Sequence, residues 1–146
     1  QMFGKDFRRD QARFINAALD YGYAVLRGTI ARGLVAHGLL PSIGLFHASE
    51  QNAFNLADDV IEPFRPLVDL FVSKHVMPDD DELRPEDKVA LVGLLNLDVG
   101  MPRGKMSVLS AIEHTIESLA RVYDGGSETL LELPVLIGLE QHRLEC

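Results

Sequence analysis

The sequence has very little of what stabilises small secreted folds or anchors a chain in a bilayer. Among its 146 residues there is one cysteine, Cys146, and no tryptophan. A single thiol cannot form an internal disulfide, which excludes a disulfide-stabilised scaffold and is consistent with a reducing, cytoplasmic location. No apolar run reaches the roughly 18 residues of a membrane-spanning helix. We therefore expect a globular chain that makes no membrane contact.

Basic residues are also in short supply. The chain has 14 Lys and Arg against 22 Asp and Glu, a net charge of −8, which by itself argues against nucleic-acid binding. The imbalance is uneven along the chain. Residues 1–47 hold six basic and three acidic residues (+3), whereas residues 48–146 hold eight and nineteen (−11). Basic character is therefore concentrated in the first third of the sequence.

A sustained alternation of apolar and polar residues is missing as well, and so is any internal repeat. Without a period of two we expect no strands. The sequence predicts a single all-α domain over residues 1–146, an irregular bundle of four to five helices packed ridges into grooves. Its 47% hydrophobic content is enough for a core of its own.

Four helices can be placed from apolar spacing and from Gly and Pro. They are expected over residues 6–37 with Asp10 as N-cap, residues 50–74 with Ser49 as cap, about ten residues after Pro85, and residues 106–123. Gly22, Gly28 and Gly33 fit inside the first helix if other helices pack closely there. Pro63 and Pro66 predict a break near Glu62. The apolar connector 38–46 should lie against the core, and the last twenty residues should form a helical turn or a docked extended tail.

The residues most able to carry chemistry lie between Gly38 and Asp69, GLLPSIGLFHASEQNAFNLADDVIEPFRPLVD. Asp58, Asp59 and Glu62 are spaced to share one helix face, where unscreened carboxylates repel one another. Arg65 or a divalent cation could compensate, since carboxylates and imidazoles suit such ions. His47 could join the cluster only if the connector folds back. Alternatively, the acids form a solvated face and His47 is an ordinary hydrogen-bonding group.

The same stretch resembles a known family. The blocks NAALDYGY, GLLPSIGLFH and FNLADDVIEPFRPLVD, within Ile15 to Asp69, occur in the order and with gaps that fit the CRISPR-associated integrase and endonuclease. This is the universal "Cas-one" protein of CRISPR adaptation, in a form similar to that of type II systems. The resemblance implies the family's all-α C-terminal catalytic domain. It also implies a fragment that lacks the family's N-terminal β-domain and the early helix bearing a metal-binding glutamate.

The resemblance implies a site for Mn²⁺ or Mg²⁺ with His47 and Glu62 as ligands. Asp59 matches an auxiliary acid of the catalytic group, and the missing upstream glutamate would be the third ligand. The implied reaction inserts short foreign DNA into the CRISPR array, as the 3′-hydroxyl of the new DNA attacks a phosphodiester at a repeat.

Partners implied by the resemblance are protospacer and repeat DNA, a second copy in the full-length homodimer, and the small "Cas-two" adaptation protein. Basic residues near Lys5, Arg8, Arg9 and Arg13 would lie along the DNA. Two other hypotheses stay open. One is a non-catalytic helical scaffold that docks DNA or protein, and the other is an unrelated all-α regulator.

Overall fold

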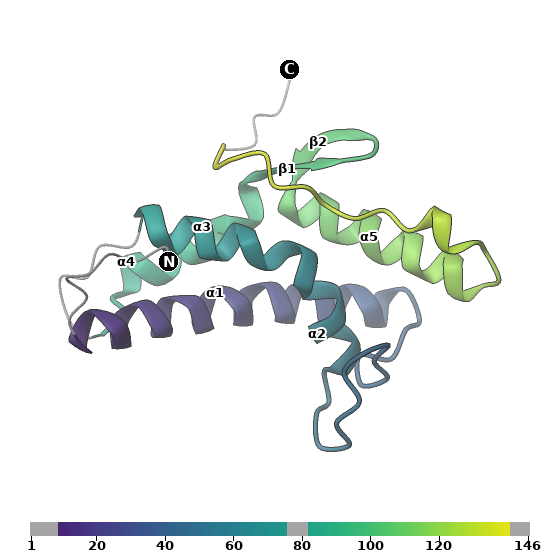
Figure 1. The fold of residues 1–146 in the computed structure, drawn as a ribbon, viewed down its shortest axis with the longest axis horizontal. Helices are drawn as coiled ribbons and strands as arrows, with labels where there is room; N and C mark the ends of the chain where they lie inside the picture. The colour runs from purple at the N-terminus through teal and green to yellow at the C-terminus, as the bar shows by residue number, and fades with distance from the viewer. Residues whose placement is uncertain (1–8, 76–81, 141–146) are drawn as a thin grey trace.

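The longest helix, α1, runs along one side of the molecule, and the other helices pack against it (Figure 1). The structure, a computed structural model, describes residues 9–75 and 82–140. Within these ranges the helices are α1 Arg9–Ala36, α2 Asn55–Ile61, α3 Arg65–His75, α4 Pro85–Val92 and α5 Val108–Tyr123, with short 3-10 helices η1 Glu62–Phe64, η2 Gly93–Asn96 and η3 Glu128–Leu130. The predicted helical architecture is thus largely confirmed.

Helix α1 forms because apolar residues recur at helical spacing on the face that meets the other helices. Phe14, Ala18, Leu26, Ile30 and Leu34 are fully or almost fully buried on this face. The helix ends as predicted before Gly38, which adopts the left-handed φ of +76°. Asp10 lies inside the helix, not at its N-cap.

The expected close packing at the helix glycines holds at two positions of three. A Cβ at Gly22 would lie 2.6 Å from Val68 Cγ1 of α3, and one at Gly33 would lie 2.6 Å from Ile116 Cδ1 of α5. A Cβ at Gly28 would meet nothing within 4 Å. Gly22 and Gly33 therefore allow α3 and α5 to approach α1, and Gly28 has no such role.

The predicted break near Glu62 is present. Helix α2 stops at Ile61, η1 contains Pro63, and α3 begins at Arg65. Because proline lacks a backbone donor and restricts the preceding residue, the α-helical ladder cannot run through this point. The helix starts later than expected, however, at Asn55 and not near residue 50, and Ser49 does not cap it.

The all-α prediction is wrong in one respect, because the chain also forms a β-hairpin. Strand β1, Asp98–Met101, pairs antiparallel with β2, Gly104–Ser107, in a register that places Val99 opposite Met106. The two strands are four residues each and the central residues of β1 are not alternately exposed. So short a run offers no readable period of two, and Gly104, with φ +119°, marks the turn.

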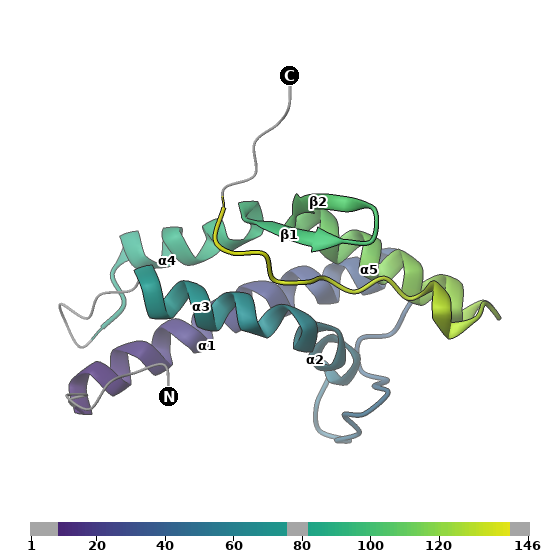
Figure 2. The same cartoon turned by 45° about the horizontal axis from the view of Figure 1, so that its top comes forward.

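The segment after α5 is a docked extended tail, one of the two expected alternatives, and it begins with the short helix η3. Val135 exchanges two backbone hydrogen bonds with Gly100 of β1, at 2.8 and 2.9 Å. Figure 2 shows the tail running beside the hairpin and back along α5. Side chains add Arg103 to Glu132 at 3.0 Å and Lys105 to Glu140 at 2.9 Å.

The connector between α1 and α2 projects from the body (Figures 1 and 2), against our expectation that it lies on the core. Leu40, Ile43 and Leu45 are more than half exposed, and Phe46 is 89% exposed. Polar groups fix the connector instead: Leu56 N donates to the Pro41 carbonyl at 2.6 Å. An apolar composition was therefore a poor guide to its burial.

Several expectations fall outside the described residues. They concern Lys5, Arg8 and Cys146, while of Arg9 only the backbone is described. In residues 9–75 and 82–140, no helix combines the length and apolarity needed to traverse a bilayer.

Candidate functional site

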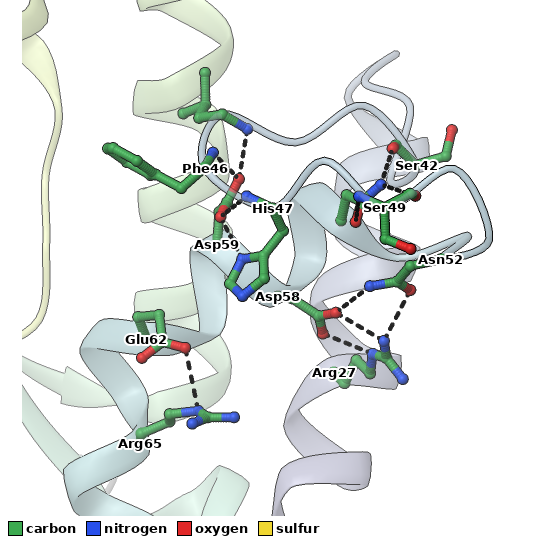
Figure 3. A network of polar contacts seen from close by, with 12 residues as sticks. Arg27, Ser42, Phe46, His47, Ser49, Asn52, Asp58, Asp59, Glu62 and Arg65 are labelled. Carbon is green, nitrogen blue, oxygen red and sulfur yellow. Dashed lines mark hydrogen bonds and ion pairs between the residues drawn. The ribbon is translucent and has the colours of Figure 1, made fainter.

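Asp59 is the centre around which the connector folds. Its Oδ2 accepts hydrogen bonds from the backbone N–H of Leu45 and of Phe46, the latter at 3.0 Å. Its Oδ1 accepts from the backbone N–H of His47 at 3.1 Å and contacts His47 Nδ1 at 2.6 Å. One carboxylate on α2 therefore holds three successive backbone amides and one imidazole (Figure 3).

Gly44 makes this arrangement possible. A Cβ at residue 44 would overlap the His47 carbonyl oxygen and lie 3.0 Å from Asp59 Oδ2 and 2.8 Å from Asn55 Cβ. Only glycine lets the backbone pass so close to α2. The buried amide of Asn55 completes the fold-back, because its Nδ2 donates to the carbonyls of Ser42 and Ser49 at 3.0 and 2.8 Å.

The electrostatics of Asp59 follow from these contacts. Burial would raise the pKa of its carboxyl, but the hydrogen bonds from Phe46, His47 and Leu45 outweigh burial and hold the pKa below the usual value. Asp59 is therefore ionised at neutral pH. With its side chain only 5% exposed, and both oxygens occupied, it is poorly placed to bind a cation itself.

The charge of Asp59 determines which nitrogen of His47 is free. An ionised carboxylate can only accept hydrogen bonds, so His47 Nδ1 must carry the proton that points at Asp59. In the neutral imidazole the lone pair is then on Nε2. A carboxylate that fixes the far nitrogen in this way is the usual support of a metal-binding histidine. The His47 side chain is 45% exposed, so Nε2 can reach an incoming group.

Glu62 lies one turn beyond Asp59, at the start of η1, and its side chain is half exposed. Its Oε1 is 3.4 Å from Arg65 Nε, which confirms the compensation expected from the spacing. Arg65 in turn packs its guanidinium 4.8 Å from the centre of the Tyr23 ring. Glu62 thus keeps an exposed carboxylate next to a single, weakly held cation.

The tyrosine is itself fixed. Tyr23 OH donates a hydrogen bond to Asp69 Oδ1, which joins α1 to α3. Burial, with the hydrogen bond and charge of Asp69, raises the pKa of Tyr23 to about 12. The ring therefore stays neutral at physiological pH.

Asp58, the third acid of the sequence cluster, points away from His47 and Glu62. A terminal nitrogen of Arg27, on α1, donates a hydrogen bond to Asp58 Oδ2 at 2.8 Å, and Arg27 Nε lies 2.8 Å from Oδ1 in the same ion pair. Asn52 Nδ2 donates to the same carboxylate at 2.6 Å, and Arg27 also lies 4.6 Å from the Phe54 ring centre. Asp58 therefore fixes the end of the connector, and the three acids have three different partners (Figure 3).

His47, Asp59 and Glu62 line one cavity of about 400 Å³. Its other walls come from η1, α5, the connector and the tail, and they are mainly apolar: Leu45, Phe46, Val60, Pro63, Thr115, Leu119, Leu131 and Leu133. Thr115 is almost fully buried, and its hydroxyl has no hydrogen-bond partner in the part of the chain that the structure describes. The two candidate ligands, His47 and Glu62, thus lie at the polar edge of a mainly apolar cavity.

The donor set fits part of a divalent-metal site. One imidazole nitrogen and one carboxylate are ligands that Mn²⁺ accepts, and Mg²⁺ commonly uses one or two carboxylates with water. Within residues 9–75 and 82–140, no three His, Cys, Asp or Glu side chains are grouped closely enough to hold a metal by themselves. His47 and Glu62 can therefore contribute ligands, but the described residues do not complete the site.

Sequence reasoning singled out His47, Asp59 and Glu62, and the structure brings all three to the same cavity. It missed Arg27, Asn52 and Tyr23. A charged residue directly after the apolar residues Ala24, Val25 and Leu26 was the signal for Arg27. The backbone amides of residues 45–47 carry no side-chain signal, so the support of Asp59 could not be read from the sequence.

Comparison with known proteins supports the resemblance. The family described as "CRISPR associated protein Cas1" matches residues 3–87. The CRISPR-associated endonuclease Cas1 of Neisseria meningitidis serogroup C (strain 8013) is 41% identical over 147 residues, which covers 99% of this chain and 48% of the relative.

Other relatives match a smaller share of the chain. A CRISPR-associated endonuclease Cas1 of Pyrobaculum aerophilum is 39% identical over 85 residues, 58% of this chain and 26% of the relative. A CRISPR-associated endonuclease Cas1 of Thermus thermophilus is 42% identical over 71 residues, which covers 48% of this chain and 22% of the relative. This chain thus spans about half the length, or less, of the curated relatives it matches. With more than half of its residues matched by the family, it belongs to the CRISPR-associated Cas1 family.

Proposed function

We propose that this chain supplies two ligands, His47 and Glu62, to the divalent-metal site of a DNA endonuclease and integrase of CRISPR adaptation. The observation that carries the proposal is the Asp59–His47 contact at 2.6 Å, which leaves Nε2 free at the cavity shared with Glu62. Membership of a family whose relatives are named endonucleases supports the activity. A further glutamate from outside these 146 residues would complete the ligand set.

The reaction would be a transesterification. The 3′-hydroxyl oxygen of a short foreign DNA forms a bond to a phosphorus atom in the CRISPR repeat, and the bond from that phosphorus to its own 3′ oxygen breaks. Bound Mn²⁺ or Mg²⁺ would supply Lewis-acid polarisation of the phosphoryl oxygen. When water replaces the hydroxyl, the same geometry gives hydrolysis, the endonuclease activity.

In this reaction the chain's own residues would hold the metal ion and orient the ligands. His47 presents Nε2 because Asp59 fixes Nδ1, and Glu62 presents a carboxylate from η1. Asp59 acts by positioning His47 and the amides of residues 45–47, not as a ligand. The apolar walls of the cavity reduce the water around the reacting groups, which strengthens electrostatic interactions there.

Partners are part of the proposal. We infer that the full-length protein binds protospacer and repeat DNA, forms a homodimer and assembles with the small Cas-two protein. These inferences rest on the family. The chain's net charge of −8 argues against non-specific DNA binding as their basis.

The decisive measurement is Mn²⁺ titration by calorimetry on the full-length protein, alongside DNA cleavage and joining with and without metal. We expect His47→Ala and Glu62→Ala each to weaken Mn²⁺ binding by at least tenfold and to abolish the metal-dependent reaction. His37→Ala is the matched control, because His37 is exposed and bonds only the Gly33 carbonyl of its own helix. Wild-type activity in His47→Ala would overturn the assignment.

The runner-up function is a non-catalytic helical scaffold for DNA or protein. It is favoured by one observation, that the described residues offer no group of three metal-binding side chains. If full-length protein gives no heat with millimolar Mn²⁺ and yet binds DNA, the scaffold function replaces the catalytic one.

A further inference from the structure

Arg65 is held at the edge of the candidate site from two directions. Its Nε lies 3.4 Å from Glu62 Oε1, and its guanidinium lies 4.8 Å from the centre of the Tyr23 ring. Tyr23 comes from α1 and is anchored by its hydrogen bond to Asp69, one turn beyond Arg65 on α3. The plane of the guanidinium therefore rests on a ring that is fixed to two helices.

The Glu62–Arg65 pair is too weak to be a stability device. Both side chains are about half exposed, at 51% and 46%, and the pair is a surface contact between residues three apart on one helical segment. Such pairs contribute about 0–1 kcal/mol. An arrangement that pins the arginine from behind with an aromatic ring calls for another explanation.

The free edge of the guanidinium provides one. Among the residues that the structure describes, the two terminal nitrogens of Arg65 have no hydrogen-bond or ion-pair partner other than Glu62. A planar guanidinium with two unused N–H groups matches the geometry of a phosphate, and it loses little freedom on binding when a ring already holds it. Stacking on an aromatic face also leaves this edge open to solvent.

The neighbour of Arg65 strengthens the argument. In the proposed site the Glu62 carboxylate turns to a cation, and Arg65 then loses its only anionic partner. A DNA phosphate placed at the same cation would offer a replacement within one helical turn.

We propose that Arg65 binds a phosphate oxygen of the DNA at this site, exchanging Glu62 for it, and that Tyr23 is the residue that positions the guanidinium. The assignment rests on the proposed function, because it takes DNA as the ligand of the site. It adds a substrate-binding residue that is not a metal ligand.

The test is fluorescence anisotropy with a labelled DNA duplex, using the full-length protein with Mn²⁺ present and, for comparison, in metal-free buffer, each over a range of salt concentrations. We expect Arg65→Gln to weaken binding several-fold and to reduce the slope of log K against log salt by about one. Arg65→Lys keeps the charge and should retain the slope while losing part of the affinity. Arg84→Gln is the control, because Arg84 also pairs with an acid three residues away at 3.5 Å but lies at the N-cap of α4.

Tyr23 variants separate positioning from simple structure. Tyr23→Leu removes the ring and should weaken DNA binding in the same direction as Arg65→Gln, whereas Tyr23→Phe keeps the ring and should bind like wild type. Circular dichroism and thermal unfolding of each variant show whether the fold is intact. If Tyr23→Leu unfolds, the variants Tyr23→Phe, Arg65→Gln and Arg65→Lys still decide the assignment of Arg65.

Metal binding provides an independent readout. If Arg65 served only to hold Glu62 for the metal, Arg65→Gln would weaken Mn²⁺ affinity; we expect affinity to be no weaker, since a positive charge leaves the vicinity of a ligand. Equal DNA affinity and slope in Arg65→Gln and Arg84→Gln would overturn the Arg65 assignment alone. Wild-type protein that binds neither DNA nor Mn²⁺ would defeat the proposed function instead.

Discussion

At the scale of single residues, two neighbouring acids bind different parts of the molecule. Asp58 and Asp59 are adjacent on α2, but Asp58 faces Arg27 and Asp59 faces the connector. Successive residues on a helix point about 100° apart, so one carboxylate can secure each side of the loop. The acids that looked mutually repulsive in sequence are each stabilised by a different group.

Asp59 should matter for stability as well as for His47. We expect Asp59→Asn to lower the free energy of unfolding by about 1–3 kcal/mol, because one carboxylate oxygen becomes an NH2 group and the N–H groups that faced that oxygen lose their acceptor. Urea unfolding measures the loss. Glu62→Gln is the matched control, since Glu62 is half exposed, and it should change stability by less than about 1 kcal/mol. Equal effects of the two substitutions would contradict the central role of Asp59.

The lowered pKa of Asp59 also makes the stability of the fold depend on pH, and the direction of that dependence is defined. The pKa of Asp59 is lower in the folded chain than its ordinary value of 3.8, so the folded state binds its proton more weakly than the unfolded state. The resulting stability is complete above the ordinary pKa and is lost as pH falls through the folded pKa. The stability advantage of wild type over Asp59→Asn should therefore be constant near neutral pH and shrink below about pH 4. Urea midpoints measured over this range check the sign.

Gly44 is the backbone counterpart of Asp59. We expect Gly44→Ala to destabilise the fold by about 1–3 kcal/mol and to speed hydrogen exchange at the amides of residues 45–47, because the added methyl forces the connector off Asp59. Gly93→Ala is the control, since a Cβ there meets nothing within 4 Å. Unchanged exchange at residues 45–47 in Gly44→Ala would show that the connector has room to move.

At the scale of elements, α1 is the surface against which the site is assembled. It carries Arg27 and Tyr23, which reach α2 and α3 through Asp58 and Asp69. The distance between α1 and α3 is set where Gly22 meets Val68. The helix pair and the polar contacts therefore depend on the same close approach.

Substitutions in α1 should separate packing from helix propensity. Gly28→Ala should stabilise the chain by up to about 1 kcal/mol, because alanine favours the helix and the position is open. Gly22→Ala gains the same propensity but should still be destabilising, since a short, stiff valine stands 2.6 Å from the new Cβ. Thermal unfolding of the two variants decides the point. Stabilisation by both would mean that α3 can shift away from α1 at little cost.

At the scale of the whole molecule, the candidate cavity joins parts that are far apart in the chain. The connector and η1 supply the polar edge, while α5 and the tail supply Leu119, Leu131 and Leu133. The tail reaches this position because β1 binds it through Gly100. The hairpin that breaks the all-α prediction therefore serves to place one wall of the site.

Releasing the tail should be possible without touching its side chains. Val135→Pro removes the N–H that donates to the Gly100 carbonyl, and Val135 is mostly exposed, so its side chain adds little packing. We expect faster hydrogen exchange at the Gly100 amide and easier proteolysis after α5, with Val135→Ala close to wild type. Protection of Gly100 in Val135→Pro equal to that in wild type would show that the tail is held elsewhere.

Much of this organisation was predictable from the sequence. The remainder could not be predicted, and the reasons are physical. The long helix and the break at Pro63 follow from local rules, and His47, Asp59 and Glu62 followed from spacing and family blocks. The hairpin was missed because four-residue strands have no legible period. Arg27 and Asp58 are 31 residues apart in the sequence, and the hydrogen bonds to Asp59 come from backbone amides. Neither contact therefore leaves a local sequence pattern.

The connector has a consequence for recognising distant members of the family. Asp59 fixes the chain at His47, and Asp58 with Arg27 fixes it again at Asn52, so the tip at Glu50 and Gln51 is exposed and bridges two anchored points. Lengthening such a tip costs little, about 0.6 kcal/mol for each doubling of a flexible loop. The step of fifteen positions from His47 to Glu62 is therefore a property of this chain and is not required by the chemistry of the site. A sequence search should allow the gap between histidine and acid to vary, while holding constant the glycine three residues before the histidine and the three-residue step from Asp59 to Glu62.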